Sequence, residues 1–73
     1  MQPYNNLGGN SNVKAYSIGE DYIEVLFHGT PKVYRYSYGR AGKEKVETMK
    51  KYALQGKGLN SYIMRYAKMD YDR

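Results

Sequence analysis

Residues 22–27, which read YIEVLF, decide the fold of this chain of 73 residues. Apolar side chains occupy every second position, at Ile23, Val25 and Phe27. In an extended strand, residues two positions apart point to the same face. We therefore expect a β-strand over 22–27 whose Ile23, Val25 and Phe27 side chains pack into the core.

Turn residues border this strand on both sides and separate it from two further strands. Residues 19–21 (GED) precede it, and residues 28–31 (HGTP) follow it. The stretches beyond these turns, 13–18 and 33–38, carry the β-branched and aromatic residues that strands favour. Because connections this short join antiparallel neighbours, we expect a three-stranded antiparallel meander.

The pattern changes from strand to helix in the C-terminal half. Val46, Met49 and Ala53 recur at helical spacing, which predicts a helix over 43–55 with one apolar stripe. Gly56 suits the left-handed position that ends such a helix. A second, shorter helix is expected over 59–66.

These elements predict an α+β domain in which two helices cover one face of a three-stranded antiparallel sheet. The expected core draws on both layers, and its members are Ile23, Val25, Phe27, Val46, Met49, Ala53, Leu59 and Ile63. Either Tyr66 or Tyr62 completes the buried side of the second helix. The other face of the sheet stays open, so we expect self-association, most simply as a twofold dimer.

The domain is expected over residues 13–66, with a short segment at each end. Residues 1–12 are rich in Asn, Gly and Ser and are expected to form a flexible arm. Residues 67–73 are expected to form a frayed tail.

Composition argues against several classes of function. The chain has no Cys and one His, so we expect no disulfide, no metal centre and no cofactor. No triad or pair of carboxylates points to catalysis. The longest apolar run, residues 25–27, is too short to span a bilayer, and the first residues lack a signal-peptide pattern. We expect a soluble, cytoplasmic protein that is not an enzyme.

Positive charge and tyrosine are both in excess. The net charge is +5, but residues 30–68 hold ten Lys or Arg against two acids, a local net charge of +8. Ten residues are Tyr, against one Phe and no Trp. Aromatic rings beside cations are typical of surfaces that bind nucleic acid. The alternative is a basic surface that only keeps the domain soluble.

The first candidate site is residues 56–60, GKGLN, between the two expected helices. Gly58 opens the second helix, and the N–H groups at a helix N-terminus attract anions. Lys57 adds a charge there, and Asn60 and Arg65 lie on the same helix as assisting groups. In the alternative interpretation, Gly56 is a C-terminal cap, Gly58 a hinge, and Asn60 a local cap or packing contact.

The second candidate site is the strand segment Tyr34-Arg35-Tyr36. Its two tyrosines point to one face of the strand and Arg35 points to the other. Two interpretations stay open: the rings stack on bases, or they pack beneath the helices. In the second case Arg35 faces out on the open sheet face, where it can grip a phosphate or a carboxylate, or stay a solvated strand residue. Tyr38 and Tyr62 are further candidate stacking rings.

Five pieces of the chain follow one another in a characteristic order: Ser11-Asn12-Val13; Ile23-x-Val25-x-Phe27; His28-Gly29 leading to Val33-Tyr34-Arg35-Tyr36; Ala53-x-x-Gly56-x-Gly58-Leu59-Asn60; and Ile63. Their order and spacing resemble the KTSC domain family, named for a C-terminal extension of some lysyl-tRNA synthetases. The resemblance spans residues 11–66 and implies a β-β-β-α-α fold, RNA binding and no catalytic residues. The family often places Val-Pro before the first helix, whereas residues 38–42 read YGRAG here, so the entry to that helix should differ.

We therefore expect a small binding protein for phosphate-bearing ligands, with RNA as the first candidate. The phosphate contacts would come from Lys43, Lys50, Lys51, Lys57 and Arg65. One alternative is an oligomer, in a viral or bacterial setting, that sequesters a nucleotide-like signal in a pocket shared by subunits. A further alternative is a protein-interaction module that uses the Tyr-rich open sheet face.

Overall fold

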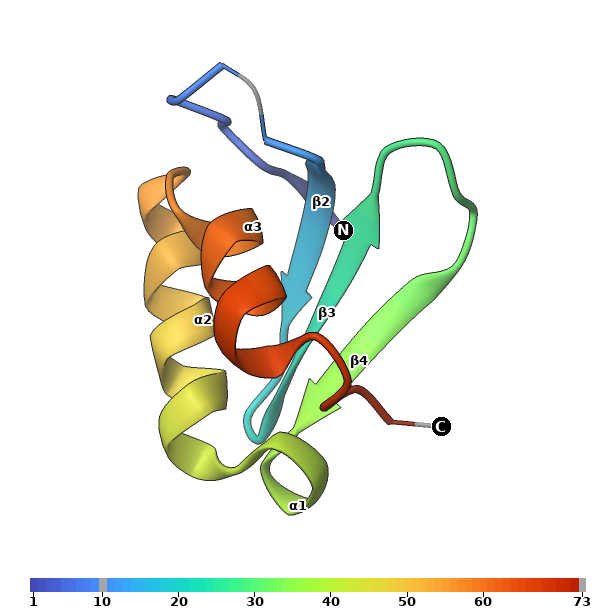
Figure 1. Ribbon diagram of the computed structural model, residues 1–73, viewed down its shortest axis with the longest axis vertical. Coiled ribbons are helices and arrows are strands. Elements are labelled where there is room, and N and C mark those ends of the chain that lie inside the picture. The colour runs from blue at the N-terminus through green and yellow to red at the C-terminus, as the bar shows by residue number, and fades with distance from the viewer. Residues whose placement is uncertain (10, 73) are drawn as a thin grey trace.

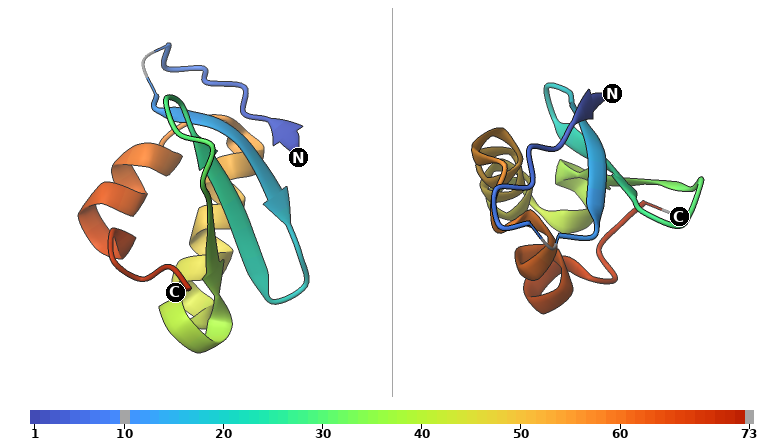
Figure 2. Two further views of the ribbon diagram at one scale, coloured as in Figure 1. Left: turned by 90° about the vertical axis from the view of Figure 1, so that its right-hand side faces the viewer. Right: turned by 90° about the horizontal axis from the view of Figure 1, so that it is seen from above.

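The computed structural model describes residues 1–9 and 11–72, and over these residues the chain is an α+β domain with a helical layer on one face of a sheet (Figure 1, Figure 2). The strands are β1 (Gln2–Pro3), β2 (Val13–Ile18), β3 (Tyr22–Phe27) and β4 (Val33–Ser37). The helices are α1 (Tyr38–Ala41), α2 (Lys43–Gln55), α3 (Leu59–Tyr62) and the π-helical turn η1 (Ile63–Ala67). No helix in the described part of the chain is long and apolar enough to cross a membrane.

The strands form one antiparallel sheet in the order β1-β2-β3-β4. Between β2 and β3 the register shifts, because Val13 pairs with Phe27 while Ala15 pairs with Leu26. The extra residue, Lys14, is a β-bulge. The bulge allows Val13 and Tyr16, three positions apart, to be buried together.

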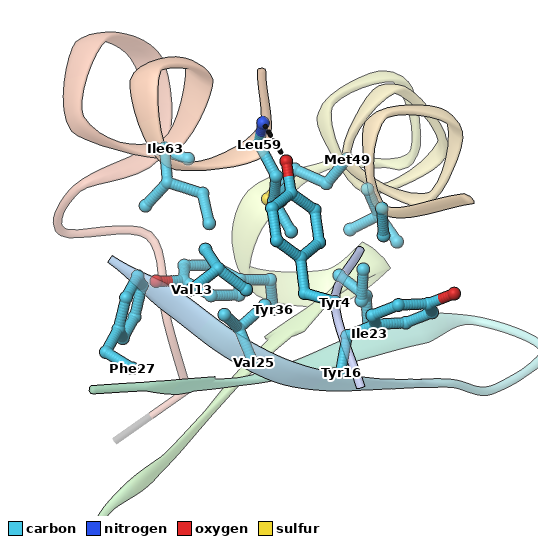
Figure 3. Close-up of a cluster of buried hydrophobic side chains, with 13 residues drawn as sticks. Tyr4, Val13, Tyr16, Ile23, Val25, Phe27, Tyr36, Met49, Leu59 and Ile63 are labelled. Atoms are coloured by element: carbon cyan, nitrogen blue, oxygen red, sulfur yellow. Dashed lines mark hydrogen bonds between the residues drawn. The ribbon is translucent and has the colours of Figure 1, made fainter. Parts of the chain in front are cut away.

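The core lies between the sheet and the helices, as Figure 3 shows. All eight residues expected there are buried, with at most 7% of any of them exposed. The prediction of this core is therefore confirmed. Five further residues complete it: Tyr4, Val13, Tyr16, Tyr36 and Ala67.

The sheet has a fourth strand that the sequence pattern did not indicate, so the expected three-stranded sheet is wrong in this respect. β1 is two residues long and pairs Gln2 with Tyr16 and Pro3 with Ala15. The Tyr16 hydroxyl donates a hydrogen bond to Gln2 Oε1 at 3.0 Å. Pro3 is tolerated because β1 is an edge strand. A segment this short carries no periodic signal of its own.

The expected N-terminal arm is packed against the domain where the structure describes it, and residue 10 lies outside the described part. Tyr4 is only 6% exposed. Its ring reaches from the sheet to the backbone of Leu59, whose buried N–H donates to the Tyr4 hydroxyl at 3.2 Å (Figure 3). This contact ties the start of the chain to the start of α3.

Replacing Tyr4 by phenylalanine should lower the free energy of unfolding by about 1–3 kcal/mol, because the buried Leu59 N–H loses its acceptor. Urea denaturation followed by circular dichroism measures the change. Tyr66→Phe is the matched control, because it removes the hydroxyl of an exposed tyrosine and should change stability by less than about 0.5 kcal/mol. Equal stabilities for wild type and Tyr4→Phe would show that the Leu59 N–H does not depend on this hydroxyl.

Over the described residues the helical layer contains three α-helices rather than two, because residues 38–41 form the short helix α1. Gly42 follows with a φ of 94°, a left-handed value that suits glycine and separates α1 from α2. The entry to the long helix is thus made by residues 38–42, the stretch that departs from the KTSC pattern. The expected bounds of the long helix, 43–55, are confirmed.

The second expected helix, 59–66, is divided into α3 and η1. Leu59 and Ile63 are buried as expected. Either Tyr66 or Tyr62 was expected to complete the buried side of this helix. Tyr66 is 55% exposed, and Tyr62 is half-buried. The wider π turn places Ala67 toward the core and leaves Tyr66 at the surface.

Residues 68–72 run back beside β4 instead of extending away from it, and residue 73 lies outside the described part (Figure 1). The backbone N–H of Asp72 donates to the Arg35 carbonyl at 2.7 Å, and the Ser37 hydroxyl donates to Asp72 Oδ1 at 2.7 Å. Lys45 Nζ lies 2.7 Å from Asp70 Oδ2. The expected frayed tail is therefore held at three points.

Candidate nucleic-acid interface

The structure brings together one group of the expected site residues and separates it from the others. Lys57 and Gly58 lie in the turn between α2 and α3, and Asn60 and Tyr62 lie on α3. Arg65 follows on η1. These five residues line two adjoining hollows, which we call the polar pocket and the aromatic groove.

Two glycines shape the turn that carries Lys57. Gly56 has a φ of 72° and donates its N–H to the carbonyls of Tyr52 and Ala53 at 3.0 and 3.1 Å, so its expected role as the C-terminal cap of α2 is confirmed. A Cβ atom at Gly56 would lie 2.6 Å from Cβ of Asn5. Gly56 therefore has the structural role of ending α2. Lys57, the next residue, is exposed.

The polar pocket has a volume of about 90 Å3 and lies between this turn and the N-terminal segment. Its lining residues are Tyr4, Asn6, Gly8, Ser11, Gly56, Lys57, Gly58, Asn60 and Ser61. Lys57 and Asn60 contribute an ammonium and an amide to this lining. A hollow of this size with such groups suits a single phosphate group better than a whole nucleotide.

The backbone at the start of α3 contributes less to this pocket than the sequence suggested. The expectation rested on unpaired N–H groups at the helix N-terminus. The N–H of Leu59, the first of them, is already bonded to the Tyr4 hydroxyl. The Leu59 N–H is therefore not available to an anion, and the side chains of Lys57 and Asn60 remain as polar groups of the pocket.

The aromatic groove has a volume of about 330 Å3 and lies along α3 and η1. Its lining residues are Tyr52, Gly58, Ser61, Tyr62, Arg65 and Tyr66. The ring of Tyr62 lies 5.5 Å from that of Tyr52 and 5.1 Å from that of Tyr66, with interplanar angles of 48° and 44°. The three rings thus form a continuous row.

Two of these rings, Tyr52 and Tyr66, were absent from the candidate site residues. Tyr66 follows Tyr62 by four positions, a spacing that places both on the same side of a helix and that could have indicated the pair. Tyr52 belongs to α2, and its contact with Tyr62 depends on how the two helices cross. Gly58 adds to this arrangement, since a Cβ there would lie 3.4 Å from the Tyr52 ring.

The polar pocket and the aromatic groove share Gly58 and Ser61, so a ligand can occupy both. No Asp or Glu is among the described residues that line either hollow. Lys57 and Arg65 are both exposed, and they bring positive charge to the polar pocket and the aromatic groove respectively. A row of rings flanked by cations can bind a chain of bases joined by phosphates.

Arg35 lies elsewhere and is already paired. It sits on the open face of the sheet, where its Nη2 and Nε donate to Glu24 Oε2 at 2.9 and 3.2 Å. The guanidinium also lies 4.3 Å from the centre of the Tyr22 ring. The hydrogen bond with Glu24 raises the pKa of Arg35. Arg35 thus faces out on the sheet as expected and grips a carboxylate, that of Glu24, one of the two anionic groups expected for it.

The other candidate stacking rings are also separated from the groove. Tyr36 is 1% exposed and belongs to the core, in agreement with the interpretation in which it packs beneath the helices. Tyr34 is half-buried against Phe27 and Tyr71. Tyr38 donates its hydroxyl to Glu47 Oε2 at 2.6 Å, and this hydrogen bond raises the pKa of Tyr38 to about 12.

The lysines of α2 differ in whether their charge is already paired within the domain. Lys50 lies 2.8 Å from Glu47 and donates to the Glu20 carbonyl at 3.0 Å, so it is a structural cation. Its hydrogen bond is the first cause of the lowered pKa of Glu47. Lys43 and Lys51 are exposed. Among the described residues, no group of three or more His, Cys, Asp or Glu could hold a metal ion.

No family model, curated protein or solved structure matches this chain. The resemblance to the KTSC domain therefore rests on the sequence pieces quoted above.

Proposed function

We propose that this protein is a non-enzymatic module that binds single-stranded RNA through the aromatic groove and the polar pocket. The observation that carries the proposal is the row of Tyr52, Tyr62 and Tyr66 rings, with Arg65 beside it and Lys57 in the adjoining pocket. Bases would stack along the row, and the two cations would meet phosphates.

A single strand fits this surface better than a duplex. Stacking on tyrosine requires an unpaired base whose face is exposed, and bases in an RNA duplex are already stacked on their neighbours. Tyr66 is 55% exposed, so its ring is accessible at the surface. Such contacts contribute roughly 1–3 kcal/mol per base and discriminate little among sequences.

Two polar groups support RNA over DNA as the ligand. Asn60 and the hydroxyl of Ser61 line the polar pocket, and Ser61 also lines the groove. Groups of this kind can donate to or accept from a ribose 2′-hydroxyl, which DNA lacks. The KTSC resemblance points in the same direction.

Fluorescence anisotropy with a labelled oligouridine at several salt concentrations tests the proposal. We expect affinity to fall as salt rises, with a log–log slope of about −0.7 for each phosphate contacted, or about −1.4 from Lys57 and Arg65 together. A duplex of the same length should bind more weakly. Binding that is independent of salt, or that favours the duplex, would contradict the proposal.

Capture of a free nucleotide is the second candidate, because the volume of the groove, about 330 Å3, falls within the range of small-molecule sites. The same titration distinguishes the two functions when the length of the oligonucleotide is varied. RNA binding predicts affinity that increases from one to several nucleotides. Nucleotide capture predicts equal affinity at all lengths, and native mass measurement should then show an oligomer with the nucleotide bound.

A further inference from the structure

A second groove lies on a different part of the surface, between the turn that joins β3 to β4 and the C-terminal segment. Its volume is about 320 Å3, and it shares no lining residue with the aromatic groove. Its lining residues are Asn12, Phe27, His28, Thr30, Tyr34, Tyr36, Met64, Lys68, Met69 and Tyr71. We call it the C-terminal groove. The proposed function makes no use of it.

One wall of the C-terminal groove is built from aromatic rings that are held in place. The ring of Tyr34 lies 5.6 Å from Phe27 and 4.9 Å from Tyr71, and Tyr36 lies 6.5 Å from Tyr71, all close to edge-to-face. Tyr71 keeps this position because the next residue, Asp72, is bonded to β4 through its backbone N–H and its carboxylate. A wall fixed in this way is preorganised for a flat apolar molecule.

The groove also contains two methionines. Met64 and Met69 are 47% and 55% exposed. Unbranched thioether side chains adjust to the shape of a partner and make favourable contacts with aromatic rings. A ring system placed in the groove would thus meet a rigid aromatic wall and adaptable methionines. The volume suits a molecule of one or two rings.

Positive charge surrounds the groove. Lys68 lines it, and Lys32 Nζ lies 4.9 Å from the centre of the Tyr34 ring and 5.2 Å from that of Tyr71. No Asp or Glu is among its described lining residues. The two acids of the C-terminal segment are engaged elsewhere, Asp70 with Lys45 and Asp72 with Ser37. The groove therefore favours an occupant that carries negative charge.

From this wall and these charges we propose that the C-terminal groove is a binding site for a small organic anion, namely an aromatic ring system that bears a carboxylate or sulfonate. The rings lie against Tyr34, Tyr71 and the methionines. The acidic group faces Lys32 and Lys68. This site is independent of RNA binding at the aromatic groove.

Anilinonaphthalene sulfonate and its uncharged counterpart phenylnaphthylamine are suitable fluorescent probes, because they share a ring system and differ in charge. We expect the sulfonate to bind the folded protein at one saturable site and more tightly than the uncharged probe. The double variant Lys32→Gln/Lys68→Gln should weaken sulfonate binding by about tenfold, the scale of one charge-assisted contact, and leave the uncharged probe unchanged. The matched control, Lys43→Gln/Lys51→Gln, removes two exposed cations that do not line the groove and should bind like wild type.

A second variant locates the site. Met64→Asp introduces a carboxylate at an exposed position of the groove, so the domain should stay folded and sulfonate binding should be lost. Melting curves recorded on every variant confirm that the folded state is being measured. Absence of saturable binding to wild type would overturn the proposal. So would equal affinity for the two probes, or equal effects of the two double variants.

Discussion

Replacing Tyr36 by alanine should lower the free energy of unfolding by about 3–5 kcal/mol, the range observed when a large aromatic side chain is removed from a core. Tyr36 is 1% exposed and is among the largest fully buried side chains of the domain. It pairs with Ile23 across β3 and β4 and contacts Tyr71 of the C-terminal segment. Its removal would leave a cavity where the sheet, the helices and the end of the chain meet.

The size of this loss matters because the domain is small. A chain of 73 residues is expected to have a total stability of roughly 4–11 kcal/mol. Tyr36→Ala should therefore remove a large share of the total stability of the domain. Urea denaturation of wild type and variant measures the difference.

Tyr66→Ala is the matched control, because it removes the same side chain from an exposed position. We expect it to change the free energy of unfolding by less than about 0.5 kcal/mol. Similar losses in the two variants would contradict the assignment of Tyr36 to the core and of Tyr66 to the surface.

The fold was predictable where one residue type repeats with a clear period. The alternation in 22–27 and the helical stripe of Val46, Met49 and Ala53 each identify one element and its buried face. The conformation of each of these elements is determined mainly by its own residues. Gly56 ended α2 as expected because its φ of 72° is costly for other residues.

The sequence pattern did not predict those features of the fold that depend on contacts between distant segments. β1 exists because Gln2 meets Tyr16 and Tyr4 meets Leu59, and neither contact has a local pattern. The bulge at Lys14 changes which residues of β2 face the core, and simple alternation does not reveal it.

In the candidate site too, residues close in the sequence were predicted correctly to lie together, and residues from distant segments were not. Lys57, Gly58, Asn60, Tyr62 and Arg65 lie within nine consecutive residues, so one short helical segment keeps them together. Arg35, a candidate phosphate ligand on the open sheet face, lies far from these residues in the sequence and is paired with Glu24. Arg35 and Glu24 lie directly opposite each other in the β3–β4 register, and this position explains their pairing.

The second large effect is expected in RNA affinity. Tyr66→Ala should weaken binding of a single-stranded oligouridine by about 1–3 kcal/mol, because one stacking ring is lost from the end of the row. Lys57→Ala should weaken it by a similar amount, about 1–3 kcal/mol, the scale of a lost charge-assisted hydrogen bond. Both residues are exposed, so the fold should survive both changes.

Two control variants make these losses specific to the proposed surface. Tyr66→Phe keeps the ring and should retain affinity within a factor of about two, because stacking does not need the hydroxyl. Lys14→Ala removes an exposed cation that lines neither the aromatic groove nor the polar pocket. It should lower affinity much less than Lys57→Ala.

Titration of one labelled oligouridine with wild type, Tyr66→Ala, Tyr66→Phe, Lys57→Ala and Lys14→Ala, under one set of salt conditions, tests the account most directly. We predict that Tyr66→Ala and Lys57→Ala bind roughly 5- to 150-fold more weakly than wild type, the equivalent of about 1–3 kcal/mol, while the other two variants bind almost as wild type does. Equal affinity across all five proteins would contradict the account, because it would show that neither the row of tyrosines nor Lys57 contacts RNA.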